Sequence, residues 1–137
     1  MKIEDYLMGR VEFTKLDSKQ QTNILQLKQR VDGLLEEFGE DRGVSSGYRT
    51  KEDHIRIYKK INEDKKAAGK PEVNVPWGSK HLVGAAVDLF DADDRLKKFC
   101  TEAILEKHNL YMEHSDFTNT WCHLQISPTS KRIFRPY

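Results

Sequence analysis

Apolar residues recur at helical spacing in the first long segment of the chain. Between Asp17 and Gly39 they return every three or four positions, which is the period of one face of an α-helix. Asp17 and Ser18 offer oxygens that can cap the start of a helix, and glycine commonly follows its end. The pattern predicts a helix over residues 18–38. Its inward-facing positions are Ile24, Leu27, Val31, Leu34, Leu35 and Phe38.

A second helical pattern begins after Thr50, whose hydroxyl can cap a helix. It carries lysines on its outer side and runs to a Gly-Lys-Pro sequence, which ends a helix. We therefore predict a helix over residues 51–68. Its expected inner positions are Ile55, Tyr58 and Ile61.

Shorter apolar runs in the rest of the chain have the length and composition of β-strands. Residues 43–49, flanked by glycines, predict a strand that opens into a turn, and residues 85–90 predict a buried strand. Residues 110–113 and 121–126 predict two further strands joined by a polar loop. The acids that follow the buried strand open a predicted third helix over residues 93–107.

Together these elements predict an α+β fold, in which a small, mainly antiparallel sheet has the helices packed on one side. The length of 137 residues fits one domain over residues 1–137, because it allows a single core and is too short for two. Residues 71–80 contain two prolines and one glycine and show no periodicity. We predict a surface loop there that leads into His81 and borders a site.

Charge and hydropathy narrow the classes of partner. Lysine plus arginine number 23 and aspartate plus glutamate 22, so the formal net charge of +1 indicates no overall attraction to nucleic acid. The first six residues carry acids where a secretory signal needs a basic start, and no segment approaches the roughly 18 apolar residues of a membrane span. We therefore expect a protein that is made and held in a cytoplasm, without nucleic-acid binding or membrane insertion.

The two cysteines, Cys100 and Cys122, are too few to define a disulfide framework, and their spacing gives no C-x-x-C zinc or redox motif. We expect both to be reduced and buried. Cys122 adjoins His123, but neighbouring residues on a strand point to opposite faces. If His123 faces a metal, Cys122 therefore faces away from it.

An acid inside an apolar run is the first sign of chemistry. Asp88 lies in the predicted strand 85–90, and an ionised carboxylate is costly to bury unless a cation or several donors compensate it. His81 lies seven positions earlier, before a turn of small residues, and His123 lies in another predicted strand. Two histidines and one carboxylate can hold a tetrahedral zinc ion with one position open for water, as in hydrolytic zinc sites. Each residue alone also has an ordinary explanation, as a loop histidine, a capping acid or a strand histidine.

Three short motifs surround these candidates. They are S-G-Y-R at residues 46–49, S-x-H-x-x-G-x-A-x-D at residues 79–88 and W-x-H at residues 121–123. The ten-residue motif is fairly specific and the W-x-H alone is weak, but all three occur in one order over well over half of the chain. In this order they resemble the zinc D,D-peptidases, a family that includes D-alanyl-D-alanine carboxypeptidases and phage endolysins that cut peptidoglycan peptides.

The resemblance implies one zinc ion held by His81, Asp88 and His123, in a fold similar to D-alanyl-D-alanine carboxypeptidases and hedgehog proteins. It also implies that Arg49 binds a substrate carbonyl or carboxylate and steadies the tetrahedral oxyanion. The fixed donors of a guanidinium suit this role.

The resemblance also implies that Tyr48 and Ser79, which lie in the same motifs, are further substrate contacts. For Arg49 there is an ordinary alternative, a surface ion pair with Glu52 or Asp53. The motif and the ion pair therefore make different predictions about where the guanidinium lies.

The chain departs from the family at Thr120. Many members have an acid three residues before the last histidine that acts as general base, and a threonine cannot take a proton from water. Glu113 and Asp116 are the nearby candidates for this role. We favour Glu113, because neighbouring strands can hold it opposite the last zinc histidine, although it also fits an ordinary exposed acid. His54 and His114 are candidates for proton transfer or oxyanion contact, each with a surface histidine as the alternative.

The resemblance implies a single-domain zinc metallopeptidase that cleaves an amide bond in the peptide part of bacterial peptidoglycan, as a D,D-carboxypeptidase or an endolysin-type endopeptidase. Its small size is similar to that of phage or prophage lytic enzymes, which reach the cell wall when a partner permeabilises the membrane, and we expect a monomer. Thr120 favours a second hypothesis, a catalytically impaired zinc-binding domain with a structural or cell-wall-binding role in phage. A third hypothesis is a metal-free fold in which these residues are incidental.

Overall fold

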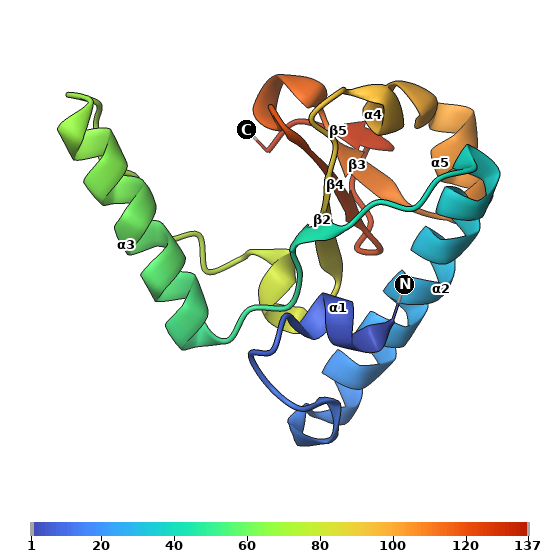
Figure 1. Ribbon diagram of the computed structural model, residues 1–137, viewed down its shortest axis with the longest axis horizontal. Coiled ribbons are helices and arrows are strands. Elements are labelled where there is room, and N and C mark those ends of the chain that lie inside the picture. Colours follow the sequence, from blue (N-terminus) through green and yellow to red (C-terminus); the bar gives the residue numbers. More distant parts are fainter. Residues whose placement is uncertain (1, 137) are drawn as a thin grey trace.

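A mixed β-sheet lies at the centre of the structure, which is a computed structural model that describes residues 2–136 (Figure 1). Its five strands have the order β1-β2-β4-β3-β5. β3 and β5 pair in parallel, and the other three pairings are antiparallel. The α+β class and the mainly antiparallel sheet are therefore confirmed. The strands are β1 (Val44–Ser46), β2 (Ala86–Phe90), β3 (Tyr111–Glu113), β4 (Trp121–Gln125) and β5 (Ile133–Phe134).

The four predicted strands are all present, each shorter than its apolar run. The fifth, β5, has only two residues and lies among polar and basic ones, so its sequence has no strand pattern. Its pairing with β3 is a long-range contact, and such contacts leave no local signal in the sequence.

The predicted first long helix is confirmed at both ends as α2 (Ser18–Phe38). The Asp17 carboxylate accepts a hydrogen bond from the Gln20 backbone N–H, and the Gln20 side chain accepts one from the Asp17 N–H. Gly39 ends the helix in the left-handed conformation, with φ of 87°. The apolar face of α2 packs into the core on one side of the sheet.

The second predicted helix is present as α3 (Lys51–Ala67), capped by Thr50, but its expected packing is wrong. α3 extends away from the sheet on the side opposite α2 (Figure 1). Ile55, expected on the inner face, is 49% exposed, and Tyr58 and Ile61 are only half-buried. Three apolar residues among lysines form too narrow a stripe to hold this helix against a sheet.

The third predicted helix is wrong as a single element, because two short helices occupy its place. They are α4 (Arg95–Phe99) and α5 (Glu102–His108). The Thr101 hydroxyl caps α5 by accepting from the Ile104 N–H at 3.3 Å. The buried Asp91 carboxylate accepts from two backbone N–H groups at the start of α4, each at 2.9 Å. These two capping side chains divide the segment.

A short helix at the start of the chain, α1 (Ile3–Leu7), also has no counterpart in the prediction. It packs against α2 and buries Tyr6 and Leu7 in the core. No helix within residues 2–136 combines the length and the apolar character that crossing a membrane demands.

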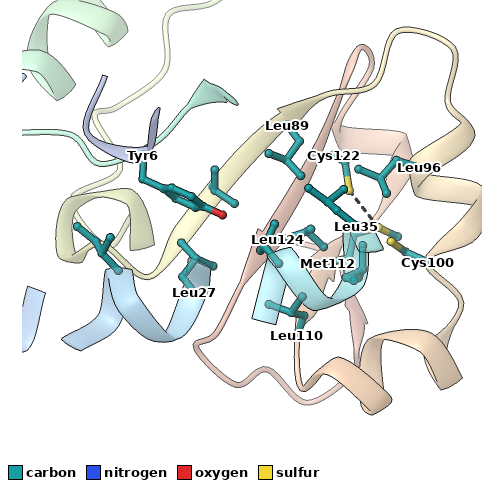
Figure 2. Packing of buried hydrophobic residues seen from close by; sticks show 14 of the residues in the cluster. Tyr6, Leu27, Leu35, Leu89, Leu96, Cys100, Leu110, Met112, Cys122 and Leu124 are labelled. Carbon is teal, nitrogen blue, oxygen red and sulfur yellow. Dashed lines mark hydrogen bonds between the residues drawn. The ribbon is translucent and has the colours of Figure 1, made fainter. Parts of the chain in front are cut away.

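The core fills the space between α2, α5 and one face of the sheet (Figure 2). Cys100 and Cys122 are both free thiols buried in this core, as predicted. The Cys122 Sγ lies 3.8 Å from the Met112 Sδ, on the core side of the sheet (Figure 2). The expectation that Cys122 points away from the face occupied by His123 is therefore confirmed.

Two glycines let the chain segments around the sheet pack closely on the helices. A Cβ at Gly47 would lie 2.1 Å from the Tyr6 carbonyl oxygen. Gly84 has φ of 74°, and a Cβ there would lie 2.7 Å from the Ile24 Cγ1. Both positions therefore require glycine, one for close approach to α1 and the other for approach to α2 and a left-handed turn.

Gly47→Ala is expected to lower the free energy of unfolding by about 1–3 kcal/mol or more, because the added methyl group meets backbone that cannot move aside easily. Gly78→Ala is the matched control, since a Cβ there meets no atom within 4 Å. Urea unfolding followed by circular dichroism measures both variants. Equal stability of the two would contradict the close packing of β1 on α1.

Candidate metal centre

One row of residues crosses all five strands on the sheet face opposite the core. Strand register sets Ser46 opposite Asp88 and Asp88 opposite His123. The next step of the β3–β4 register brings Glu113 opposite His123, and Glu113 in turn pairs with Phe134. Directly opposed residues project to the same face, so these five side chains lie side by side.

An irregularity in β1 is needed to complete this row. The register of β1 against β2 shifts between Val44, which pairs with Leu89, and Ser46, which pairs with Asp88. Such a bulge changes the face to which the following residue points. It brings the Ser46 side chain to the polar face of the sheet.

Three side chains in and beside the row converge on one point. His81 lies on a 3-10 helix, η2 (Lys80–Val83), and its Nε2 is 3.3 Å from the Asp88 Oδ2. The His123 Nδ1 is 2.7 Å from the Asp88 Oδ1. All three potential ligand atoms lie within 4.8 Å of one another. The structure thus brings together the three residues that the sequence predicted as metal ligands.

Hydrogen bonds on the outer side of each imidazole fix which nitrogen faces Asp88. The His81 Nδ1 lies 2.9 Å from the Gly47 carbonyl oxygen, which can only accept, so Nδ1 carries the proton. The Gln125 side-chain NH₂ donates to the Ser127 carbonyl, which turns the Gln125 oxygen toward the His123 Nε2 at 2.9 Å. Nε2 of His123 therefore donates. The inward nitrogens, Nε2 of His81 and Nδ1 of His123, are left to act as acceptors.

The electrostatics of the cluster favour a positive charge at its centre. Burial raises the pKa of Asp88, but the two imidazoles outweigh this effect and hold that pKa well below its ordinary value. Burial lowers the pKa of His81. Burial also opposes a charge on His123, yet its hydrogen bond to Asp88 raises the pKa of that imidazole. The carboxylate is therefore ionised, and either a proton or a metal cation can balance it.

The donor set fits zinc. Two imidazole nitrogens and one carboxylate oxygen are ligands that zinc accepts, and their outer hydrogen bonds supply the support that zinc histidines commonly have. Three protein ligands leave one tetrahedral position open. These three residues could therefore hold a metal ion such as zinc, with one coordination position open.

Glu113 lies next to this cluster, as its predicted place opposite His123 requires. Its side chain is half-buried, and burial, together with the charge of Asp88, raises the pKa of Glu113. Within residues 2–136, no side chain hydrogen-bonds its carboxylate, and His123 and Asp88 act on it only through their charges. This carboxylate is therefore available as a proton acceptor.

Asp116, the other predicted base, lies on a 3-10 helix, η3 (Ser115–Phe117), in the loop between β3 and β4. It is exposed, and it pairs with Arg135 at 2.9 Å and with His114 at 3.5 Å. These partners hold it in the loop. Of the two predicted acids, Glu113 is therefore the one that lies beside the cluster.

Arg49 is attached to the row by its side chain and its backbone. Its Nε and Nη2 donate to the Ser46 hydroxyl at 3.1 and 2.9 Å. Its backbone N–H donates to the His81 carbonyl at 3.1 Å. The alternative pair with Asp53 is not formed, since that carboxylate bonds Thr50 and other arginines. The guanidinium therefore lies beside the cluster.

Tyr48 and Ser79 are the two further residues that the motifs implied as substrate contacts. Tyr48 is buried in the core, with its hydroxyl 3.4 Å from the Gln20 Nε2. It points away from Arg49 because adjacent residues of an extended chain alternate. Ser79 is half-buried at the start of η2. Tyr48 is thus a core residue here, and a substrate contact by Ser79 stays a prediction.

Sequence reasoning missed several residues around the cluster. Gln125 lies two positions after His123 on the same strand, so strand alternation alone indicates that the two share a face. The Phe134 ring lies 6.0 Å from that of His123, but β5 gave no signal. The expectation of a surface position for His54 is wrong, because this residue is fully buried.

Comparisons with known proteins identify no relative: no protein-family model, no curated protein and no solved structure matches this chain. The interpretation of the site therefore depends on its own geometry and on the resemblance of its motifs.

The purified protein is expected to bind one zinc ion, and His81→Ala or His123→Ala is expected to abolish stoichiometric binding, because each removes one of three ligands. His114→Ala is the matched control, since that ring faces Asp116 in the loop. Elemental analysis measures the zinc content. Equal zinc in the His123→Ala and His114→Ala proteins would contradict this ligand set.

Gln125→Leu is expected to weaken zinc binding by about 10- to 100-fold, because it removes the acceptor that orients His123. Gln125→Glu keeps an acceptor at this point and should retain affinity. Competition with a chelator of known affinity gives both values. If the leucine variant binds as tightly as the parent, the orienting role assigned to Gln125 is wrong.

Proposed function

We propose that this chain is a zinc-dependent peptidase that hydrolyses an amide bond in the peptide part of bacterial peptidoglycan. The observation that carries the proposal is the grouping of three kinds of chemistry around Asp88. Two imidazoles provide metal ligands, Glu113 provides a free carboxylate and Arg49 provides a guanidinium. A metal, a general base and a donor to the developing oxyanion can each contribute to peptide hydrolysis.

His81, Asp88 and His123 would hold the metal. When bound, zinc supplies Lewis acidity and lowers the pKa of water. Glu113 accepts the proton of the attacking water and passes it to the leaving amine. Its raised pKa suits this exchange, because a base of higher pKa takes a proton more readily and still returns it as an acid.

Arg49 binds the substrate oxygen that becomes negative. A guanidinium has five N–H donors; three of the Arg49 donors are directed at Ser46 and His54, and the group also interacts with the Tyr58 side chain. The remaining donors can bind a carbonyl oxygen or a terminal carboxylate and stabilise the charge of the tetrahedral intermediate. In this proposal the scissile amide lies between Arg49 and Glu113.

The motif resemblance supports peptidoglycan as the substrate class, cut either by D,D-carboxypeptidase or by endolysin-type endopeptidase action. In this proposal the chain is a monomeric lytic enzyme of phage or prophage. It is made in the cytoplasm and acts on the cell wall after release. The loop that carries Trp77, which is 53% exposed, contributes to substrate selection.

Thr120 favours a second candidate, a zinc-binding domain without turnover that has a structural or cell-wall-binding role in phage. Thr120 is exposed, and its backbone carbonyl accepts from the Asp91 N–H at 2.9 Å. Its side chain cannot act as a base. Under this hypothesis Glu113 is an ordinary half-buried acid and the protein holds zinc without releasing amines.

Glu113→Gln is expected to keep one zinc ion and lower turnover by about 10²- to 10⁴-fold, because the amide cannot accept a proton. Asp116→Asn is the matched control and should retain turnover. The measurement is the release of amines from purified peptidoglycan, with and without a chelator. Retained turnover in Glu113→Gln would remove Glu113 from the mechanism, whereas zinc binding without release by the unaltered protein would favour the binding domain.

A further inference from the structure

His54 is buried in a helix whose other residues are half-buried or exposed. It is the one fully buried residue in α3, with 0% exposure. Its ring lies 5.0 Å from that of Tyr58 and 5.6 Å from that of Trp77. An imidazole between two aromatic rings is held in one orientation. Its two nitrogens therefore face defined partners.

The hydrogen bonds of this ring run from a loop to Arg49. The His54 Nε2 lies 3.0 Å from the Pro76 carbonyl oxygen, which can only accept, so Nε2 carries the proton. Nδ1 is then an acceptor, and it lies 3.4 Å from the Arg49 Nη1. Burial lowers the pKa of His54, and the nearby charge of Arg49 acts in the same direction. The neutral ring that this bond requires is thus the favoured form.

We propose that His54 is the positioning residue of Arg49: it accepts one N–H of the guanidinium and connects it to the loop at Pro76. This inference rests on the proposed function, in which Arg49 binds the substrate oxygen. Ser46 holds one edge of the guanidinium through Nε and Nη2, and His54 holds Nη1.

Two contacts are needed because an arginine side chain is long and flexible. Ordering it costs rotamer entropy, and a single anchor would leave the plane of the guanidinium free to turn. Contacts at two edges set that plane before a substrate arrives, which preserves the binding energy of the remaining donors. The anchor at Pro76 also attaches this arginine to the loop that carries the exposed Trp77.

A purely structural role for His54 would use a different nitrogen of the ring. Joining α3 to the loop needs only the Nε2 donor at Pro76, whereas positioning Arg49 needs the Nδ1 acceptor. Two amide variants separate these roles. His54→Asn places an acceptor where Nδ1 lies, and His54→Gln places a donor where Nε2 lies.

The first experiment compares hydrolysis of soluble muropeptides, prepared from purified peptidoglycan with a muramidase. His54→Gln should lower kcat/KM about tenfold or more, because it removes a hydrogen bond to a charged group. The loss should be divided between KM and kcat in the same proportion as in Arg49→Lys. His54→Asn should stay close to the parent. In an Arg49→Lys background His54→Gln should add little further loss, because both changes remove one interaction. Additive losses, or equal losses in the Asn and Gln variants, would overturn the positioning role.

The second experiment needs no turnover. The Nε–H signal of Arg49 in an ¹⁵N–¹H spectrum, identified by its disappearance in Arg49→Lys, should be sharp in the parent and in His54→Asn. It should broaden or shift in His54→Gln. An unchanged signal in His54→Gln would overturn the proposal. If the unaltered protein releases no amines, the peptidase function fails, and this spectrum still decides whether His54 holds Arg49.

Discussion

The buried carboxylate of Asp88 is the group on which the rest of the site depends. Its oxygens face His81 and His123 at 3.3 and 2.7 Å. The outer nitrogens of both imidazoles already donate to the Gly47 carbonyl and the Gln125 side chain, so electron pairs point inward from all three groups. An ionised carboxylate in this environment is costly without a cation. A zinc ion would account for the burial of Asp88 and for both outer hydrogen bonds.

Strand register carries this arrangement across the sheet. Asp88, His123 and Glu113 lie in one row on the polar face, and their neighbours along the strands fill the core behind them. A slip of one residue in any pairing would exchange these two sets of side chains. The packing of the core therefore also fixes the positions of the candidate metal ligands and the candidate base. The glycines at 47 and 84 allow the flanking segments to approach closely enough to complete the cluster.

Local patterns predicted those parts of the molecule that local forces determine. The helix at 18–38 has its cap, its apolar face and its terminal glycine in sequence, and the structure confirms all three. The predicted packing of α3 was wrong, because its apolar stripe is too narrow to hold the helix against the sheet. The acid within an apolar run and the motif resemblance predicted His81, Asp88 and His123 as metal ligands, and the structure brings these three side chains together. The burial of His54 was not predicted, because it comes from Trp77 and Pro76, which lie more than twenty residues away in a loop without periodicity.

X-ray absorption spectroscopy at the zinc edge tests the central assignment most directly, because it reports the atoms bound to the metal. Ligation by His81, Asp88 and His123 predicts only nitrogen and oxygen neighbours, at about 2.0–2.2 Å, with the multiple scattering of two imidazoles. A sulfur neighbour at about 2.3 Å would contradict the assignment. It would mean that a cysteine binds the metal, and neither cysteine lies on the sheet face that carries Asp88.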